Sequence, residues 1–172
     1  MTDRDIGLVD GLESYPPGVV LAGNLVFWLQ VALGAVAAGF VWKWLAAAYL
    51  LYFFAGWLFL RYSVCGRCYY RGKRCCMGWG LLLAARDDPE LWRSFPDSAG
   101  IKVAPFFYGS LSALPVLLLV YELITDFSVA AAIVLASIIV LSGVGFAMRP
   151  ASCKRCRMRA ICPGAAAGPE SA

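Results

Sequence analysis

All seven cysteines of this 172-residue chain lie in two short segments, residues 65–76 and 153–162. Each segment begins with a Cys-x2-Cys pair, continues through an Arg-rich stretch, and reaches another cysteine six or seven residues after the second. The cysteines that match in this way are Cys65, Cys68 and Cys75 in the first segment and Cys153, Cys156 and Cys162 in the second. The first segment also carries Cys76, which has no counterpart in the second. So regular a distribution indicates that the cysteines form a site.

Four kinds of cysteine chemistry compete to explain the pattern. Structural disulfides are disfavoured because the charge distribution, described below, places both segments in the reducing cytoplasm. Inert buried cysteines are disfavoured because the flanking residues are charged. Thiol redox exchange stays open, since a neighbouring Arg lowers the pKa of a thiol and a Cys-x2-Cys pair supports a reversible disulfide. Metal ligation is the interpretation that we favour.

A metal site follows from the spacing, because two thiolates separated by two residues can bind one tetrahedral ion. Two such pairs, one from each segment, would close a four-thiolate zinc site. The third cysteine of each segment would then be unused, and three thiolates per segment suit an iron–sulfur cluster better. The predicted ligands are therefore Cys65, Cys68, Cys75, Cys153, Cys156 and Cys162, with zinc and an iron–sulfur cluster both open as the cofactor. Cys76 could be a spare, a fourth ligand or an acylation site.

Residues Cys153–Gly164, which read Cys-x2-Cys-x5-Cys-Pro-Gly, resemble the ligand run of the auxiliary-cluster (SPASM-type) domains of radical-SAM maturases. The resemblance implies ligands of the kind that hold a [4Fe–4S] cluster. It covers this short segment alone, and the chain has no radical-SAM domain and no fourth cysteine downstream. The resemblance therefore bears on the type of ligand and not on an activity.

The composition is that of a membrane protein. Hydrophobic residues make up 61% of the chain and charged residues 15%, and the mean hydropathy is +0.71. Four apolar runs, at residues 19–42, 44–60, 104–124 and 127–148, approach or exceed the roughly 20 residues that one span needs. The expected fold is an all-α integral membrane protein with a four-transmembrane-helix bundle.

The basic residues predict the orientation of this bundle. All Lys and Arg residues except Lys43 fall before the first run, between the second and third, or after the fourth. These three regions share one side of a four-span topology, and the positive-inside rule makes that side the cytoplasm. We therefore expect both termini and both cysteine segments to be cytoplasmic, in a cell inner or plasma membrane.

The chain reads as two copies of a hairpin followed by a cysteine cluster, which would be parallel repeats related by an axis along the membrane normal. Its expected parts are a polar, exposed N-terminal segment (1–18), a first transmembrane hairpin (19–64), a cytoplasmic loop with a cysteine cluster (65–103), a second transmembrane hairpin (104–148), a C-terminal cysteine cluster (149–164) and a disordered tail (165–172). Within the loop, Asp88 followed by Pro89 predicts the start of a short interfacial helix. Leu91, Trp92 and Phe95 are expected to lie against lipid headgroups.

The chain has no histidine, which excludes imidazole bases, Ser–His–Asp and Cys–His catalytic systems and His-ligated metals. We expect a non-enzymatic protein whose metal site is structural or docks a cytoplasmic or membrane protein partner. The alternatives are an iron–sulfur electron-transfer subunit and a thiol redox or metal-transfer protein. Topology accounts for the basic residues, so the lipid bilayer is an expected partner and nucleic acid is not.

Overall fold

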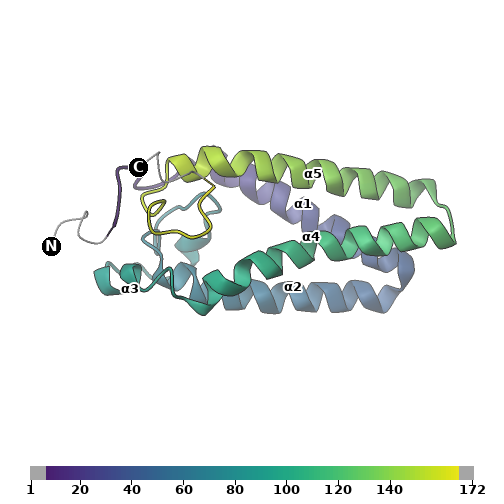
Figure 1. Cartoon of the computed structure of the whole chain (residues 1–172), viewed down its shortest axis with the longest axis horizontal. Coiled ribbons are helices and arrows are strands. Elements are labelled where there is room, and N and C mark those ends of the chain that lie inside the picture. The colour runs from purple at the N-terminus through teal and green to yellow at the C-terminus, as the bar shows by residue number, and fades with distance from the viewer. Residues whose placement is uncertain (1–6, 167–172) are drawn as a thin grey trace. The chain divides into compact units, whose positions relative to one another are not determined.

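The computed structural model describes residues 7–166 and is helical, with no strand in that part of the chain. The elements in chain order are α1 (Pro17–Val41), α2 (Lys43–Ser63), η2 (Cys65–Arg67), η3 (Trp79–Leu82), α3 (Pro89–Arg93), α4 (Ala99–Thr125) and α5 (Val129–Lys154), where η marks a short 3₁₀ turn (Figure 1). The predicted disordered tail, apart from residues 165 and 166, lies outside the described residues, as do residues 1–6.

Four helices of the described chain, α1, α2, α4 and α5, are long and apolar enough to cross a membrane. This confirms the all-helical fold and the four apolar runs. Helices of this length and composition are typical of a membrane protein. Helices α2 and α5 extend beyond the predicted runs at the ends that adjoin the cysteine segments. In particular, α5 continues to Lys154, so that Cys153 lies in its last turn.

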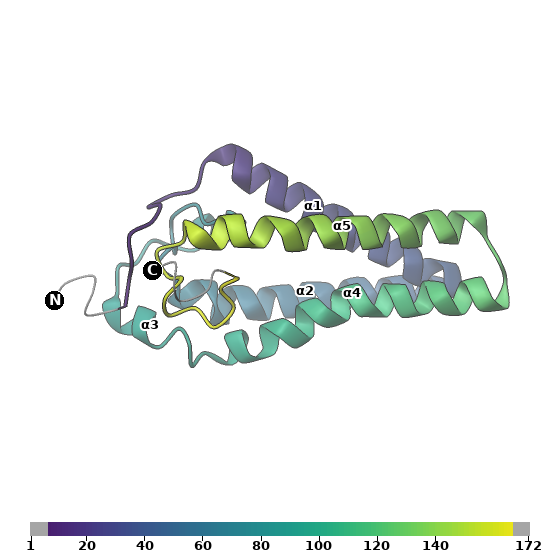
Figure 2. The ribbon, with the colours of Figure 1, turned by 45° about the horizontal axis from the view of Figure 1, so that its top comes forward.

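The chain divides into two compact units, each built from several stretches of sequence. The cysteine-bearing unit comprises the described residues of Met1–Asn24, Phe59–Ala104 and Phe146–Ala172, and the helical unit comprises Leu25–Leu58 and Pro105–Gly145. In the helical unit, parts of α1, α2, α4 and α5 run alongside one another (Figure 2). Its core contains Ala37, Leu119, Ala131 and Ile138, each at most 1% exposed.

A polar side chain joins three helices inside the helical unit. The amide of Gln30 in α1 donates to the hydroxyl of Ser112 in α4 at 3.2 Å and to that of Ser142 in α5 at 2.7 Å. Such bonds between apolar helices hold the helices together, because hydrocarbon offers the amide no other partner.

We expect Gln30→Leu to lower the free energy of unfolding by about 1 kcal/mol, the usual size of such a bond in a membrane bundle. Reversible unfolding in mixed micelles measures the change. Ser137→Ala is the matched control, because the Ser137 hydroxyl bonds to Ile133 of its own helix. Equal stability of the two variants would show that the bonds of Gln30 contribute nothing.

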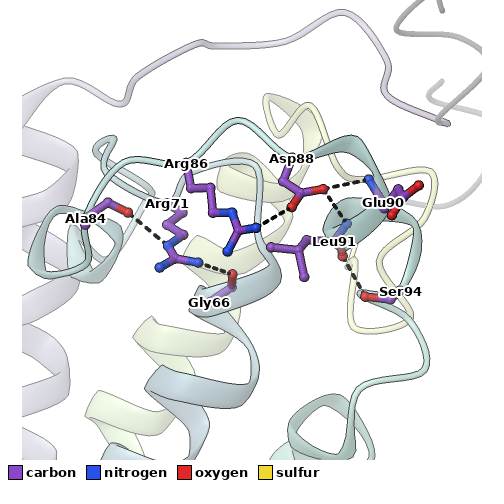
Figure 3. Close-up of polar contacts among 8 residues, drawn as sticks. All are labelled: Gly66, Arg71, Ala84, Arg86, Asp88, Glu90, Leu91 and Ser94. Atoms are coloured by element: carbon purple, nitrogen blue, oxygen red, sulfur yellow. Dashed lines mark hydrogen bonds and ion pairs between the residues drawn. The ribbon is translucent and has the colours of Figure 1, made fainter.

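The short helix predicted at Asp88 is present as α3. The Asp88 carboxylate accepts from the N–H of Glu90 at 3.2 Å and of Leu91 at 3.4 Å, and it pairs with Arg86 at 3.2 Å (Figure 3). The prediction that Trp92 and Phe95 face lipid headgroups is wrong. These side chains are 7% and 4% exposed and lie in the core of the cysteine-bearing unit, where they bury more apolar area than an interface would.

We expect Asp88→Ala to destabilise α3 by about 1 kcal/mol through loss of the N-cap. Amide exchange at residues 90 and 91 should accelerate. Arg86→Ala removes the ion pair and keeps the cap, and since exposed pairs contribute about 0–1 kcal/mol, it should change exchange little. If Arg86→Ala matched Asp88→Ala, the ion pair rather than the cap would be the stabilising contact.

Candidate metal centre

Three stretches of sequence meet in the cysteine-bearing unit: the two cysteine segments and residues 8–15, here called the strap. Backbone N–H groups of the strap donate to both segments. Val9 donates to the carbonyl of Arg157 at 3.0 Å and Leu12 donates to that of Arg155 at 2.9 Å. Tyr15 donates to the carbonyl of Arg74 at 2.9 Å. The strap therefore ties the first cysteine segment to the second.

Most described residues of the N-terminal segment are exposed, but two of its side chains are buried. Leu8 and Tyr15 are each 2% exposed and belong to the core of this unit. The sequence gives little sign of this burial, because acidic residues dominate the segment and the two buried side chains are seven residues apart. The free energy gained by burying these two side chains favours docking of the segment, although most of its residues are polar.

The cysteines of both segments border the core of the unit. Its buried residues are Leu8, Tyr15, Tyr69, Tyr70, Trp92, Phe95 and Met158. The cysteines packed against it are Cys68, Cys75, Cys76, Cys156 and Cys162. All seven thiols are free and half-buried. Two segments that are about 80 residues apart in the sequence thus pack against the same hydrophobic core.

Two tyrosines hold the backbone next to the cysteines. The hydroxyl of Tyr15 donates to the carbonyl of Ser152 at 2.7 Å, directly before Cys153. The hydroxyl of Tyr70 donates to the carbonyl of Leu12 at 2.7 Å and accepts from the N–H of Arg157 at 3.2 Å, directly after Cys156. Each aromatic side chain from one stretch of sequence therefore fixes the backbone of another.

Met158 makes a direct sulfur contact between the two cysteine segments. It is 1% exposed, and its thioether accepts the N–H of Tyr69 at 3.0 Å and the thiol of Cys68 at 3.3 Å. Met158 is not among the residues predicted from the sequence. The available signal was an apolar side chain flanked by Arg157 and Arg159 within a segment of ligands.

The middle cysteine of each segment is affected by the other two of its own segment. Burial raises the pKa of the Cys68 thiol well above its ordinary value. The charges of Cys65, Cys75 and Cys156 raise this pKa further by repulsion. Burial likewise raises the pKa of the Cys156 thiol. The charges of Cys162 and Cys153 raise this pKa further. The thiols within each segment thus interact electrostatically, and those of Cys68 and Cys156 interact across the two segments.

Cys76, which the repeat leaves over, also interacts with the second segment. Burial raises the pKa of its thiol to about 12. The charges of Cys75, Cys156 and Cys153 contribute to this increase by repulsion. The thiols of Cys153 and Cys156, more than 70 residues further along the chain, therefore act electrostatically on Cys76.

The expectation that neighbouring Arg residues lower the thiol pKa is wrong for several of these cysteines. Arg149 does lower the pKa of Cys162, but burial outweighs it and the net shift is upward. For Cys68, Cys76 and Cys156 burial is also the largest cause, and the shift is upward. Desolvation disfavours the thiolate more than the Arg residues favour it.

Carbonyl and aromatic groups position several basic side chains of the two cysteine segments. Arg71 donates to the carbonyl of Gly66, between the cysteines of the first pair, at 3.2 Å and to that of Ala84 at 2.9 Å (Figure 3). Arg157 donates to the hydroxyl of Tyr69 at 2.7 Å, and Lys73 lies 4.2 Å from the centre of the same ring. This fixed positive charge would offset the negative charge of a thiolate-bound metal.

In residues 7–166, no three Cys, Asp or Glu side chains already lie in an arrangement that could hold a metal ion. The thiols are gathered around one core without being at coordination distance. Comparison with known proteins adds no assignment, since no family model, curated protein or solved structure matches the chain. A function must therefore be argued from the chemistry of the site.

Proposed function

We propose that the cysteine-bearing unit holds a cysteine-ligated metal centre, with zinc or an iron–sulfur cluster as its cofactor. The ligands would be Cys65, Cys68, Cys75, Cys153, Cys156 and Cys162. The centre would clamp the loop between the second and third spans to the segment after the fourth. Its role is structural or partner-docking, and the surface so formed would face a cytoplasmic or membrane protein.

The observation that carries the proposal is the convergence of the two cysteine segments on one core. Tyr15, Tyr70 and Met158 each join one segment to another part of the unit. Thiolates are the ligands that zinc and iron–sulfur clusters prefer, and metal binding deprotonates them.

The orientation belongs to the same proposal. Lys43 would be the one basic residue on the opposite side of the four spans, so the positive-inside rule favours a cytoplasmic location for the cysteines. Two hairpins, each followed by a cysteine segment, would then be parallel repeats. A reducing compartment also favours thiolates bound to metal over disulfides.

The test is elemental analysis and visible absorption of the full-length protein, purified anaerobically in detergent. Zinc without colour would support a structural clasp. Iron with acid-labile sulfide and a visible absorbance that reductant bleaches would support a cluster, and with it the electron-transfer alternative. Protein with neither metal and seven reactive thiols would contradict the proposal and favour thiol exchange.

A further inference from the structure

The short turn η3 has a buried half and an exposed half. Trp79 and Gly80 are buried, whereas Leu81 and Leu82, which follow them directly, are 55% and 57% exposed. These leucines lie in the connection between α2 and α4, outside the four helices that are long enough to cross a membrane. Their exposed apolar area favours a partner that removes it from water.

The buried half of the turn is fixed to the start of α1. The side-chain amide of Asn24 donates to the carbonyl of Met77 at 2.8 Å, and its oxygen accepts the indole N–H of Trp79 at 3.3 Å. Gly78 has a φ of +70°, and a Cβ there would stand 2.6 Å from the side chain of Val20. The turn therefore lies directly against the first two turns of α1.

The exposed half of the turn is fixed to the end of α2. The guanidinium of Arg61 donates to the carbonyl of Leu82 at 2.6 Å. From within the loop, the N–H of Gly72 donates to the carbonyl of Gly80 at 2.8 Å. Since α2 ends at Ser63, Leu82 lies beside the last turn of this helix.

The ends of α1 and α2 are where two spanning helices would leave hydrocarbon for lipid headgroups. Both helices are long and apolar enough to cross a membrane. On these ends, Leu21 and Tyr62 are 70% and 71% exposed, and tyrosine is enriched at membrane interfaces. In a bilayer, Leu81 and Leu82 would therefore adjoin helix surfaces that lipid already covers.

The charge around the turn fits an anionic lipid surface. Residues 61–86 include six basic residues and no acidic one. The next two residues, Asp87 and Asp88, pair with Lys73 at 3.5 Å and with Arg86 at 3.2 Å, which offsets two of the six charges. Clusters of about four to eight basic residues beside a spanning helix are typical of segments that bind anionic lipids.

We propose that η3 is a membrane anchor: Leu81 and Leu82 insert between the headgroups of an anionic leaflet, and the basic residues of 61–86 bind lipid phosphates. Apolar insertion and attraction to anionic lipid together set the strength of such interfacial binding. The sequence suggests this role for Trp92 and Phe95, but those side chains are in the protein core.

The anchor would hold the first cysteine segment to the membrane surface. The second segment is followed by Pro163, Gly164 and three alanines, with no pair of leucines, so it has no equivalent turn. None of the contacts that fix η3 involves a thiol, and the anchor is therefore independent of the proposed metal centre.

The experiment is photo-crosslinking of the full-length protein in nanodiscs, with a diazirine analogue of leucine in place of Leu82. The analogue has nearly the volume of leucine, so the turn should fold as before. After illumination in discs of phosphatidylcholine and phosphatidylglycerol, mass spectrometry should find a lipid adduct at position 82. The matched control carries the same analogue in place of Glu90, which is exposed and follows the two aspartates, and should give several-fold less adduct.

Lipid composition tests the role of charge. The yield at position 82 should fall several-fold in discs of phosphatidylcholine alone, and also at high salt, which screens exposed charges. Equal yields in the two kinds of disc would overturn the binding of lipid phosphates by the basic residues.

Three results would overturn the anchor itself. Equal lipid adducts at positions 82 and 90 would show that the turn has no preferred contact with the membrane. Crosslinks from position 82 to a second copy of the chain would make the leucines a surface for self-association. Crosslinks within the chain would show that another segment covers them. The metal content of the same samples tests the proposed function separately.

Discussion

Removal of the metal should loosen the cysteine-bearing unit while the helical unit stays folded. Structural zinc contributes an apparent free energy of about 10–16 kcal/mol in small zinc-dependent domains, which exceeds the stability of most small units. Chelation should therefore accelerate amide exchange in both cysteine segments and in the strap. Exchange in the helical unit, whose core contains Leu119 and Ile138, should not change.

Amide exchange followed by mass spectrometry, with and without the chelator, measures this result. Protein with Cys65, Cys68, Cys153 and Cys156 all changed to serine is the control, since chelation should have no effect on it. Identical exchange of the unchanged protein before and after its metal is removed would show that the metal does not stabilise this unit.

Gly11→Ala should detach the strap from the second cysteine segment. A Cβ at Gly11 would stand 2.7 Å from the carbonyl oxygen of Arg155 and 2.9 Å from the nitrogen of Arg157. These are backbone atoms, so the strap itself must shift. The bonds from Val9 and Leu12 flank this position, and their loss would lower the free energy of unfolding of the unit by about 1–3 kcal/mol.

The measurement is exchange of the Val9 and Leu12 amides together with the alkylation rate of the thiols, both of which should rise. Gly18→Ala is the matched control, because a Cβ there has no neighbour within 4 Å. In helix α1 that change should stabilise the protein by about 0.5–1 kcal/mol. A strap that stays protected in Gly11→Ala would refute its proposed role as a tie between the segments.

The helical fold could be read from the sequence because its cause is local. Each apolar run is long enough to span a bilayer, and the Asp88-Pro89 pair carries its own helix start. The predicted helix ends were less accurate. The charges after residue 148 suggested an end to the fourth span, but the helix continues to Lys154 because Lys and Arg residues are compatible with helix geometry.

The gathering of the cysteines could be predicted only in part. Their matching spacing indicated one kind of site, whereas the strap and Met158 depend on contacts between residues 58 to 149 positions apart. No periodicity encodes such contacts. The burial of Leu8 and Tyr15 could not be predicted for the same reason, since it depends on a hydrophobic core to which distant segments contribute.

The central claim is that sulfur from this chain holds a metal, and X-ray absorption at the edge of the metal in the isolated protein tests it most directly. We predict a first shell of sulfur alone, at about 2.3 Å for zinc or iron. The chain has no histidine, so it cannot supply imidazole nitrogen. A first shell of nitrogen or oxygen would show that the metal is not held by the cysteines and would contradict the account.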